Sequence, residues 1–224
     1  MNKKSQRIFA GILAVLVSIA MVGSGILVFF FSGDEPPTGQ SASAQAATAE
    51  YQAQKLRIDA MVQQSKVDPE NVPLQTALGN EYYEAGVAAQ KVAPDEMKAN
   101  FSKAVEAYQI VLKTKKDPNV IVDMATSAFY SGNYDLADKS YKEALVIQPN
   151  FISALFNYGI FLSQAKQDWA GALDQWKKAL PLAQKSADKE QIQAMISQAE
   201  SELKANPAAN GTTNQNPNPA VKAN

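Results

Sequence analysis

A pattern of small and aromatic residues recurs three times in the middle of the chain, and it constrains the fold more than any other feature. In each copy a small residue is followed four positions later by an aromatic residue, and three positions after that by another small or branched residue. The copies are Ala104–Tyr108–Val111, Ala137–Tyr141–Ala144 and Ala172–Trp176–Ala179, offset by 33 and 35 residues. Spacings of four and three place these side chains on one helix face, where small residues let a neighbouring helix approach closely.

A second helical segment precedes each copy. Its markers are Leu78-Gly79, Met124-Ala125 and Tyr158-Gly159. Gly86 and Gly132-Asn133 follow the first two markers, and we expect a turn at each place because these residues favour turns. The repeated unit is therefore predicted to be helix, turn, helix, with a period of about 34 residues.

On these residues the region 72–182 resembles the tetratricopeptide repeat family. The second copy matches best, with Gly132, Ala137, Tyr141, Ala144 and Pro149 at positions of the family pattern. The resemblance implies an all-α protein: a right-handed α-solenoid of about three helix-turn-helix repeats, at 72–117, 118–151 and 152–182.

Two of the copies depart from the pattern. The third has one extra residue before Ala172, and the first has about 13 extra residues near Val87 to Ala99. Within this insertion Pro94-Asp95-Glu96 has the composition of a first helical turn. We therefore expect an unusually long first hairpin rather than a long loop.

Helices are also expected on both sides of the repeats. The segment 49–67 carries an apolar stripe and is predicted to be a flanking helix, ended by Asp68-Pro69. The segment 187–205 carries another stripe and is predicted to cap the last repeat, whose apolar face has no further neighbour. Residues 32–48, rich in Ser, Ala, Gln and Pro, are expected to be a flexible linker. Residues 206–224 are expected to be a disordered tail.

The N-terminal segment predicts a membrane anchor. Residues 8–31 are 24 residues without a charged side chain, about 36 Å of helix, which spans a hydrocarbon core of about 30 Å. Lys3, Lys4 and Arg7 precede it, so residues 1–7 are expected in the cytoplasm and the repeats on the other side of the cell membrane. A cleavable signal peptide is the alternative, with Ala42-Ser43-Ala44 as its cleavage site, although the apolar run exceeds the usual length.

Composition bears on which functions are plausible. The chain has no cysteine and no histidine, and its formal net charge is −1. Disulfides, thiolate metal sites and cysteine nucleophiles are excluded, and the commonest general base and metal ligand is missing. Nothing in the charge suggests nucleic acid as a partner. We expect no enzymatic activity, no cofactor, no metal site and no small-molecule substrate.

The resemblance also nominates a binding face. In tetratricopeptide stacks the first helix of each pair lines the concave side, and residues there that do not face the core are candidates for contact with a protein or peptide. The partner-binding candidates are Asn80, Tyr83, Asn119, Val122, Thr126, Phe129, Tyr130, Phe156, Asn157 and Ile160. They include no Lys or Arg, which disfavours the carboxylate clamp of one subgroup of the family.

An aromatic and amide-rich lining suits an extended segment or an amphipathic helix. Replacing both Phe129 and Phe156 with alanine is expected to abolish partner binding and leave the fold largely intact. A flanking helix could instead fill the same groove.

The leading functional hypothesis is a membrane-tethered extracytoplasmic scaffold that binds a protein or peptide in its concave groove. Proteins of similar layout serve bacterial envelopes in envelope protein assembly, secretion or cytochrome c maturation. The alternative is a permanently packed structural subunit of a larger membrane complex.

Overall fold

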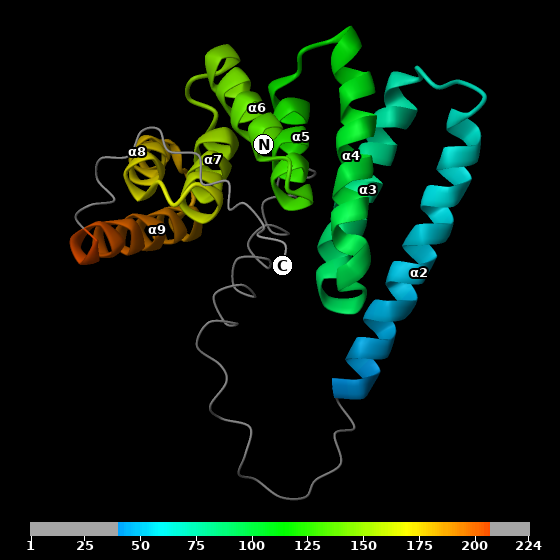
Figure 1. Ribbon diagram of the computed structural model, residues 1–224, viewed down its shortest axis with the longest axis horizontal. Coiled ribbons are helices and arrows are strands. Elements are labelled where there is room, and N and C mark those ends of the chain that lie inside the picture. The colour runs from blue at the N-terminus through cyan, green and yellow to red at the C-terminus, as the bar shows by residue number, and fades with distance from the viewer. Residues whose placement is uncertain (1–39, 207–224) are drawn as a thin grey trace, which may run out of the picture. The chain divides into compact units, whose positions relative to one another are not determined.

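The computed structural model describes residues 40–206, and helices account for nearly all of this part (Figure 1). They are α2 (Gln40–Ser65), α3 (Val72–Val92), α4 (Pro94–Thr114), α5 (Pro118–Ser131), α6 (Tyr134–Ile147), α7 (Ile152–Ala165), α8 (Trp169–Ala179) with a 3₁₀ turn at Leu180–Leu182, and α9 (Ser186–Ala205). No strand occurs between residues 40 and 206. The predicted all-α class is therefore confirmed for the described part of the chain.

Several predictions concern residues outside this range: the cytoplasmic segment 1–7, the membrane helix 8–31, the first half of the linker and nearly all of the tail. Within residues 40–206, none of the helices combines the length and the hydropathy that crossing a bilayer requires. The chain divides into two compact units between Ser140 and Tyr141, inside α6. The two units are described separately below.

Helix starts in this chain follow directly from its sequence. The side chain of Asn71 accepts a hydrogen bond from the Leu74 amide at the start of α3, at 3.0 Å. Asp117 and Asp168 cap α5 and α8 in the same manner. Proline also stands within the first turns of α3, α4 and α5, where its missing amide proton costs nothing. Side-chain caps of this type stabilise a helix by about 1 kcal/mol each.

The first hairpin is long, as its inserted sequence predicts. Helices α3 and α4 have 21 residues each and are joined through Ala93. The turn predicted at Gly86 is wrong, because Gly86 lies buried within α3. A Cβ at this position would lie 2.9 Å from three ring carbons of Phe101 in α4. Glycine is therefore present here for close helix packing and not for a turn.

The tyrosine and tryptophan of the repeat pattern pack on small residues of the preceding helix. The ring of Tyr108 lies against Gly79, and the indole of Trp176 lies against Gly159. The Trp176 Nε1–H also donates a hydrogen bond to the Phe156 carbonyl at 3.1 Å. These contacts explain the pairing of glycine and aromatic residue in the first and third copies.

The turn that ends α5 uses glycine for a different reason. Gly132 has φ +91°, and the Asn133 amide reaches back to the Ala128 carbonyl at 2.8 Å. After α7 the corresponding bond runs from the Asp168 amide to the Leu162 carbonyl at 2.9 Å, so this turn holds one more residue. Gln167, with φ 54°, takes the left-handed conformation there. The extra residue before Ala172 is accommodated in this turn.

Helix α2 begins at Gln40, whereas the sequence predicted a linker up to residue 48 and a helix from 49. The early turns are rich in alanine, the best helix former, and residues 44–50 are exposed. Further along, Tyr51 and Ile58 pack against Ala85 and Ala89 of α3. The first turns of α2 thus form without a buried face, which is why apolar periodicity did not reveal them.

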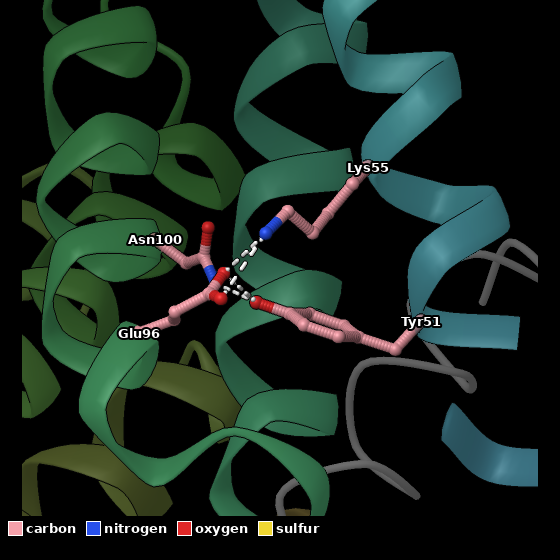
Figure 2. A network of polar contacts seen from close by, with 4 residues as sticks. All are labelled: Tyr51, Lys55, Glu96 and Asn100. Atoms are coloured by element: carbon pink, nitrogen blue, oxygen red, sulfur yellow. Dashed lines mark hydrogen bonds and ion pairs between the residues drawn. The ribbon is translucent and has the colours of Figure 1, made fainter. Parts of the chain in front are cut away.

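A polar network also joins α2 to α4 (Figure 2). The Tyr51 hydroxyl donates to Glu96 Oε2 at 2.8 Å and accepts from Asn100 Nδ2 at 2.9 Å. Lys55 Nζ lies 2.8 Å from the same Glu96 oxygen. Hydrogen bonds from Lys55 and Tyr51 lower the pKa of Glu96. The extra length of the first hairpin is therefore used to hold α2.

In the second unit, α9 packs against α8. Its buried residues are Ile192 and Ala199. Lys177 of α8 and Glu200 of α9 lie 3.1 Å apart. The sequence predicted a capping helix at 187–205, and α9 spans Ser186–Ala205.

Candidate partner-binding face

The ten candidate residues lie on α3, α5 and α7, the first helices of the three hairpins. The buried ones are Tyr83, Val122, Thr126, Phe129, Phe156, Asn157 and Ile160. Asn80 and Tyr130 are half-buried, and Asn119 is exposed. The structure therefore differs from the expectation that these side chains point away from the core.

The reason is clearest in α7, which is apolar on all sides and buries ten of its 14 residues. A helix with this composition packs on all its faces. Phe156 is only 1 % exposed. The expectation that Phe156 can be truncated without loss of the fold is therefore wrong, since removing a buried aromatic ring costs about 3–5 kcal/mol.

Three candidates come together in one row of aromatic rings in the first unit. Tyr83 meets Phe101 edge-on at 5.6 Å between centroids, and Phe101 stacks with Tyr130 at 5.1 Å. Tyr130 contacts Phe129 at 4.7 Å, which in turn contacts Tyr134 at 6.2 Å. We call these five residues the aromatic row. It leads from the buried Tyr83 to Tyr134, which is 46 % exposed.

Tyr130 is the candidate of this row that keeps partial exposure. Burial raises its pKa to about 12, so its hydroxyl stays neutral at any physiological pH. A half-buried tyrosine offers a rigid apolar surface with a polar tip, which is the usual chemistry of an interface anchor.

Next to the aromatic row lies a polar cluster formed by Asn80, Tyr108 and Asp123, one residue from each of α3, α4 and α5. The Tyr108 hydroxyl donates to Asn80 Oδ1 at 3.0 Å. Burial raises the pKa of Tyr108 well above its usual value, and the charges of Asp123 and Glu84 raise it further. We refer to these three residues as the inner polar cluster.

Asp123 is the charged member of this cluster. Desolvation, with a smaller contribution from Asp117, raises its pKa to about 7. Its backbone carbonyl accepts a hydrogen bond from Ser127 Oγ at 2.8 Å. The carboxylate itself has no hydrogen-bond or ion-pair partner among residues 40–206. Asp123 as a whole residue is half-buried, and its carboxyl group is the desolvated part.

Asp123 is not among the candidates predicted from the sequence, although its place in the sequence is unusual. It is the only charged residue in the run Val120–Ala128, on the helix whose other residues were nominated. Phe101 and Tyr108 lie on α4, the second helix of the first hairpin, and both are fully buried beneath this face.

The remaining candidates have local roles. The backbone amide and the side-chain amide of Asn119 both donate to Asp117 Oδ1, at 2.9 and 3.0 Å, which belongs to the cap of α5. In the second unit, Asn157 is buried and its Oδ1 has no hydrogen bond within the described part of the chain. Phe156 supplies the carbonyl that holds Trp176.

A metal site has no support in this part of the molecule. Between residues 40 and 206, no group of three or more acidic side chains is arranged to hold a metal ion. The groups that this face offers are a carboxylate, an amide and aromatic rings.

Comparison with known proteins agrees with the repeat architecture. No protein-family model matches the chain. The photosystem I assembly protein Ycf3 of Acaryochloris marina (strain MBIC 11017) is 27 % identical over 119 residues, which cover 46 % of this chain and 68 % of that protein. This relative is a tetratricopeptide protein. This similarity supports a helical repeat protein of the tetratricopeptide type.

A solved structure, that of the type IV pilus biogenesis factor PilW, was also compared. It is 16 % identical, and the match covers 76 % of this chain and 95 % of PilW with a TM-score of 0.37.

Proposed function

We propose that this protein is a membrane-tethered scaffold that binds a protein or peptide partner on the inner face of its first unit. The inner face is the surface formed by the inner polar cluster and by Tyr130. The observation that carries the proposal is the desolvated carboxylate of Asp123, which has no hydrogen bond or ion pair among residues 40–206, on the same helix as the half-buried ring of Tyr130. Isolated desolvated charges are costly, and in proteins they are normally kept for a partner or a function.

Similarity to Ycf3, by name an assembly protein of photosystem I, supports a role in assembling a protein complex. A scaffold of this kind needs no catalytic group, and we propose none. Its partner would be a subunit or peptide that it holds during assembly in or at the membrane.

The tether rests on residues 8–31, which we propose to be a single transmembrane helix with the basic residues 1–7 in the cytoplasm. Only residues 32–39 separate this segment from Gln40, where α2 begins. Fully extended, eight residues reach about 28 Å. The repeats would therefore stay close to the outer lipid surface, and the local concentration of a membrane-bound partner would be high.

A permanently packed structural subunit is the second candidate. The end of α6 favours it, because Val146 is 81 % exposed and Ile147 is 44 % exposed. Neighbouring exposed apolar side chains of this kind are typical of a surface that another chain covers.

Site-specific photocrosslinking in living cells tests the proposed scaffold. A photoreactive amino acid would replace Glu84 of α3 or Asn119 of α5, exposed residues near the inner face, and Gln109 or Glu190 at exposed control positions. We expect one protein to be captured from the first pair and not from the second pair. Equal capture from all four positions, or from none, would contradict a partner site on this face.

A further inference from the structure

We propose that helix α2 of a second copy of this chain packs in parallel on the outer face of α2. The contact would run along exposed residues that are spaced alternately three and four apart: Ala46, Ala49, Ala53, Leu56, Ala60 and Gln63. We call these residues the α2 seam. The inference goes beyond the proposed partner site, and it uses the proposed tether only for the orientation of the two copies.

The spacing of the α2 seam is that of a coiled coil. Steps of three and four residues in alternation repeat every seven residues and keep one apolar side of a helix turned toward a partner helix. With Ala53 at position a of this heptad, Leu56 takes position d. Single exposed leucines are common on protein surfaces, but Leu56, which is 71 % exposed, lies in register with the rest of the seam. Val67, which is 88 % exposed, follows at the next position a, in the turn beyond Ser65.

The α2 seam lies opposite the face of α2 that packs into its own unit. Tyr51 and Ile58, which pack against α3, occupy position f of the same heptad. At about 100° per residue, position f lies about 170° around the helix from the middle of the a and d positions. The hydrogen bonds of Tyr51 and Lys55 with Glu96 hold α2 in this rotation (Figure 2). Two copies can therefore meet along the seam while their repeats extend away from each other.

The first turns of α2 have no support from their own unit. All residues from 44 to 50 are exposed, and Figure 1 shows these turns extending past the α3–α4 hairpin. Helical turns that reach beyond their packing depend on intrinsic propensity, which is marginal in water even for alanine. Contact with the same turns of a second copy would stabilise them, because small side chains allow two helices to approach closely.

The chemistry of the α2 seam favours a second copy over a different partner. The seam carries no charge, and its one polar residue, Gln63, has an amide group that both donates and accepts hydrogen bonds. Gln63 Oε1 accepts a hydrogen bond from Lys66 Nζ at 3.0 Å, and its amide group can donate to the second copy's Gln63. A single polar residue inside a coiled-coil seam specifies the register of the two helices.

The residues that flank the seam are compatible with a parallel pair. In a parallel pair, position g of one helix faces position e of the next heptad on the other helix. Each of the facing pairs contains a glutamine, so none of them brings like charges together. The pairs are Gln45 with Glu50, Gln52 with Arg57, and Asp59 with Gln64.

The proposed anchor would set the orientation and the concentration of the two copies. Only residues 32–39 separate the anchor from Gln40, so both copies would have the N-terminus of α2 nearest the same lipid surface. A seam of alanines with one leucine buries little apolar area and would be weak between free chains. Confinement to a membrane raises the effective concentration, which allows a weak contact to form.

Disulfide crosslinking of the full chain in its membrane tests this contact. The natural chain has no cysteine, so Ala49→Cys and Ala60→Cys each place a single thiol in the seam, and copper phenanthroline supplies the oxidant. A disulfide requires Cα atoms within about 7 Å, which only a position close to its own copy satisfies. We expect each variant to form a covalent homodimer, whereas Ser102→Cys and Gln109→Cys, at exposed positions of α4, should not.

The same two positions distinguish the orientation. In an antiparallel pair centred between Ala53 and Leu56, Ala49 of one copy would face the second copy's Ala60. A disulfide would then form only when Ala49→Cys and Ala60→Cys are mixed, and this result would overturn the parallel pair. An adduct with another protein, or no crosslink above that of the α4 controls, would overturn the second copy as the occupant.

A charge placed in the seam verifies that the seam makes the contact. Ala53→Glu, added to Ala49→Cys, should lower the crosslinked fraction about tenfold or more, because two like charges would face each other. Gln109→Glu adds the same charge on α4 and should leave the fraction unchanged. Both positions are exposed, so circular dichroism should show native helical content in both variants. An unchanged fraction in Ala53→Glu would mean that the anchor alone brings the copies together, and would overturn the inference.

These outcomes are separate from those of the proposed function. The α2 seam and the inner face lie on different helices, so loss of partner capture from the inner face would leave the homodimer to be judged by its own crosslinks. If residues 1–31 prove to be a cleaved signal peptide, the released protein would be crosslinked in the same way. A homodimer would then support the seam, and a monomer would overturn it.

Discussion

At the scale of single residues, Asp123 links the stability of the molecule to its proposed use. Its pKa of about 7 lies above the ordinary value of 3.8 because the carboxylate is desolvated near Asp117. The folded protein therefore holds this proton more tightly than the unfolded chain does. The contribution of this tighter proton binding to the free energy of unfolding is fully present below pH 4. It is lost as the pH rises toward 7.

This linkage gives the first prediction. Asp123→Asn should raise the free energy of unfolding by about 2–3 kcal/mol at pH 8 and should change it little at pH 4, since each pKa unit corresponds to about 1.4 kcal/mol and partial exposure reduces the effect. Urea unfolding at the two pH values measures it, with Glu190→Gln as the control. Equal destabilisation at both pH values would mean that the carboxylate makes a favourable contact in the fold. A stabilising substitution that weakens binding would be typical of a functional site.

Gly86 gives the second prediction, in which two effects oppose each other. Alanine in the interior of a helix is worth up to about 1 kcal/mol over glycine. The added Cβ would, however, lie 2.9 Å from the ring of the fully buried Phe101. We expect Gly86→Ala to lower the free energy of unfolding by about 1–3 kcal/mol, because overpacking outweighs propensity.

A second substitution, at Phe101, tests whether overpacking causes the loss of stability in Gly86→Ala. Phe101→Leu should be less harmful in the Gly86→Ala background than in the native chain, because the smaller side chain leaves room for the new methyl group. Urea unfolding of the two single variants and the double variant forms a thermodynamic cycle. Additive losses would show that the ring of Phe101 is not the cause.

At the scale of helices, the periodicity of the sequence was sufficient to predict the hairpins but not their packing partners. Spacings of four and three are properties of one helix, and they correctly indicated α4, α6 and α8. A glycine marks either a turn or a close contact, and the sequence does not say which until its neighbour is known. Gly86 was predicted as a turn for this reason. The start of α2 was missed because its first turns are exposed and rich in alanine, and so show no apolar periodicity.

The prediction of the binding face from the sequence was limited in the same way. Concave positions were assigned from a family pattern that treats each hairpin alike, yet α7 is too apolar to leave such a face open. Asp123, in contrast, could have been found from sequence by asking why a helix rich in apolar residues contains one acid. A lone charge on a predicted apolar helix is a stronger indication of a site than another aromatic residue.

Helix α2 provides the third prediction. Tyr51 is 1 % exposed and its hydroxyl joins Glu96 to Asn100, whereas the side chains of the Lys55–Glu96 ion pair are 40 % and 45 % exposed. Tyr51→Phe should destabilise the docking of α2 by about 1–2 kcal/mol, because it leaves hydrogen-bonding groups unpaired. Lys55→Gln should cost less than about 1 kcal/mol, since exposed ion pairs contribute little.

Native-state hydrogen exchange measures this effect element by element. In Tyr51→Phe the amides of α2 should exchange faster, while those of α5 keep their native rates. Uniformly faster exchange in both helices would mean that α2 unfolds only together with the rest of the first unit. A larger effect for Lys55→Gln than for Tyr51→Phe would assign the stabilisation to the ion pair instead.

At the scale of the whole molecule, the proposed anchor and its orientation give the last prediction. The natural chain has no cysteine, so single introduced cysteines report their side of the membrane without background. We expect Ser102→Cys, at an exposed position of α4, to react with a membrane-impermeant maleimide in bacteria whose outer membrane has been permeabilised. Ser5→Cys should react only after the inner membrane is opened, because the proposed topology places Lys3, Lys4 and Arg7 in the cytoplasm. If Ser5→Cys is missing from the mature protein, the segment is a cleaved signal peptide; if the two labelling patterns are reversed, the proposed topology is wrong. Deletion of residues 1–31 should release the protein into the soluble fraction with its helical content unchanged, since the buried contacts of α2 begin at Tyr51.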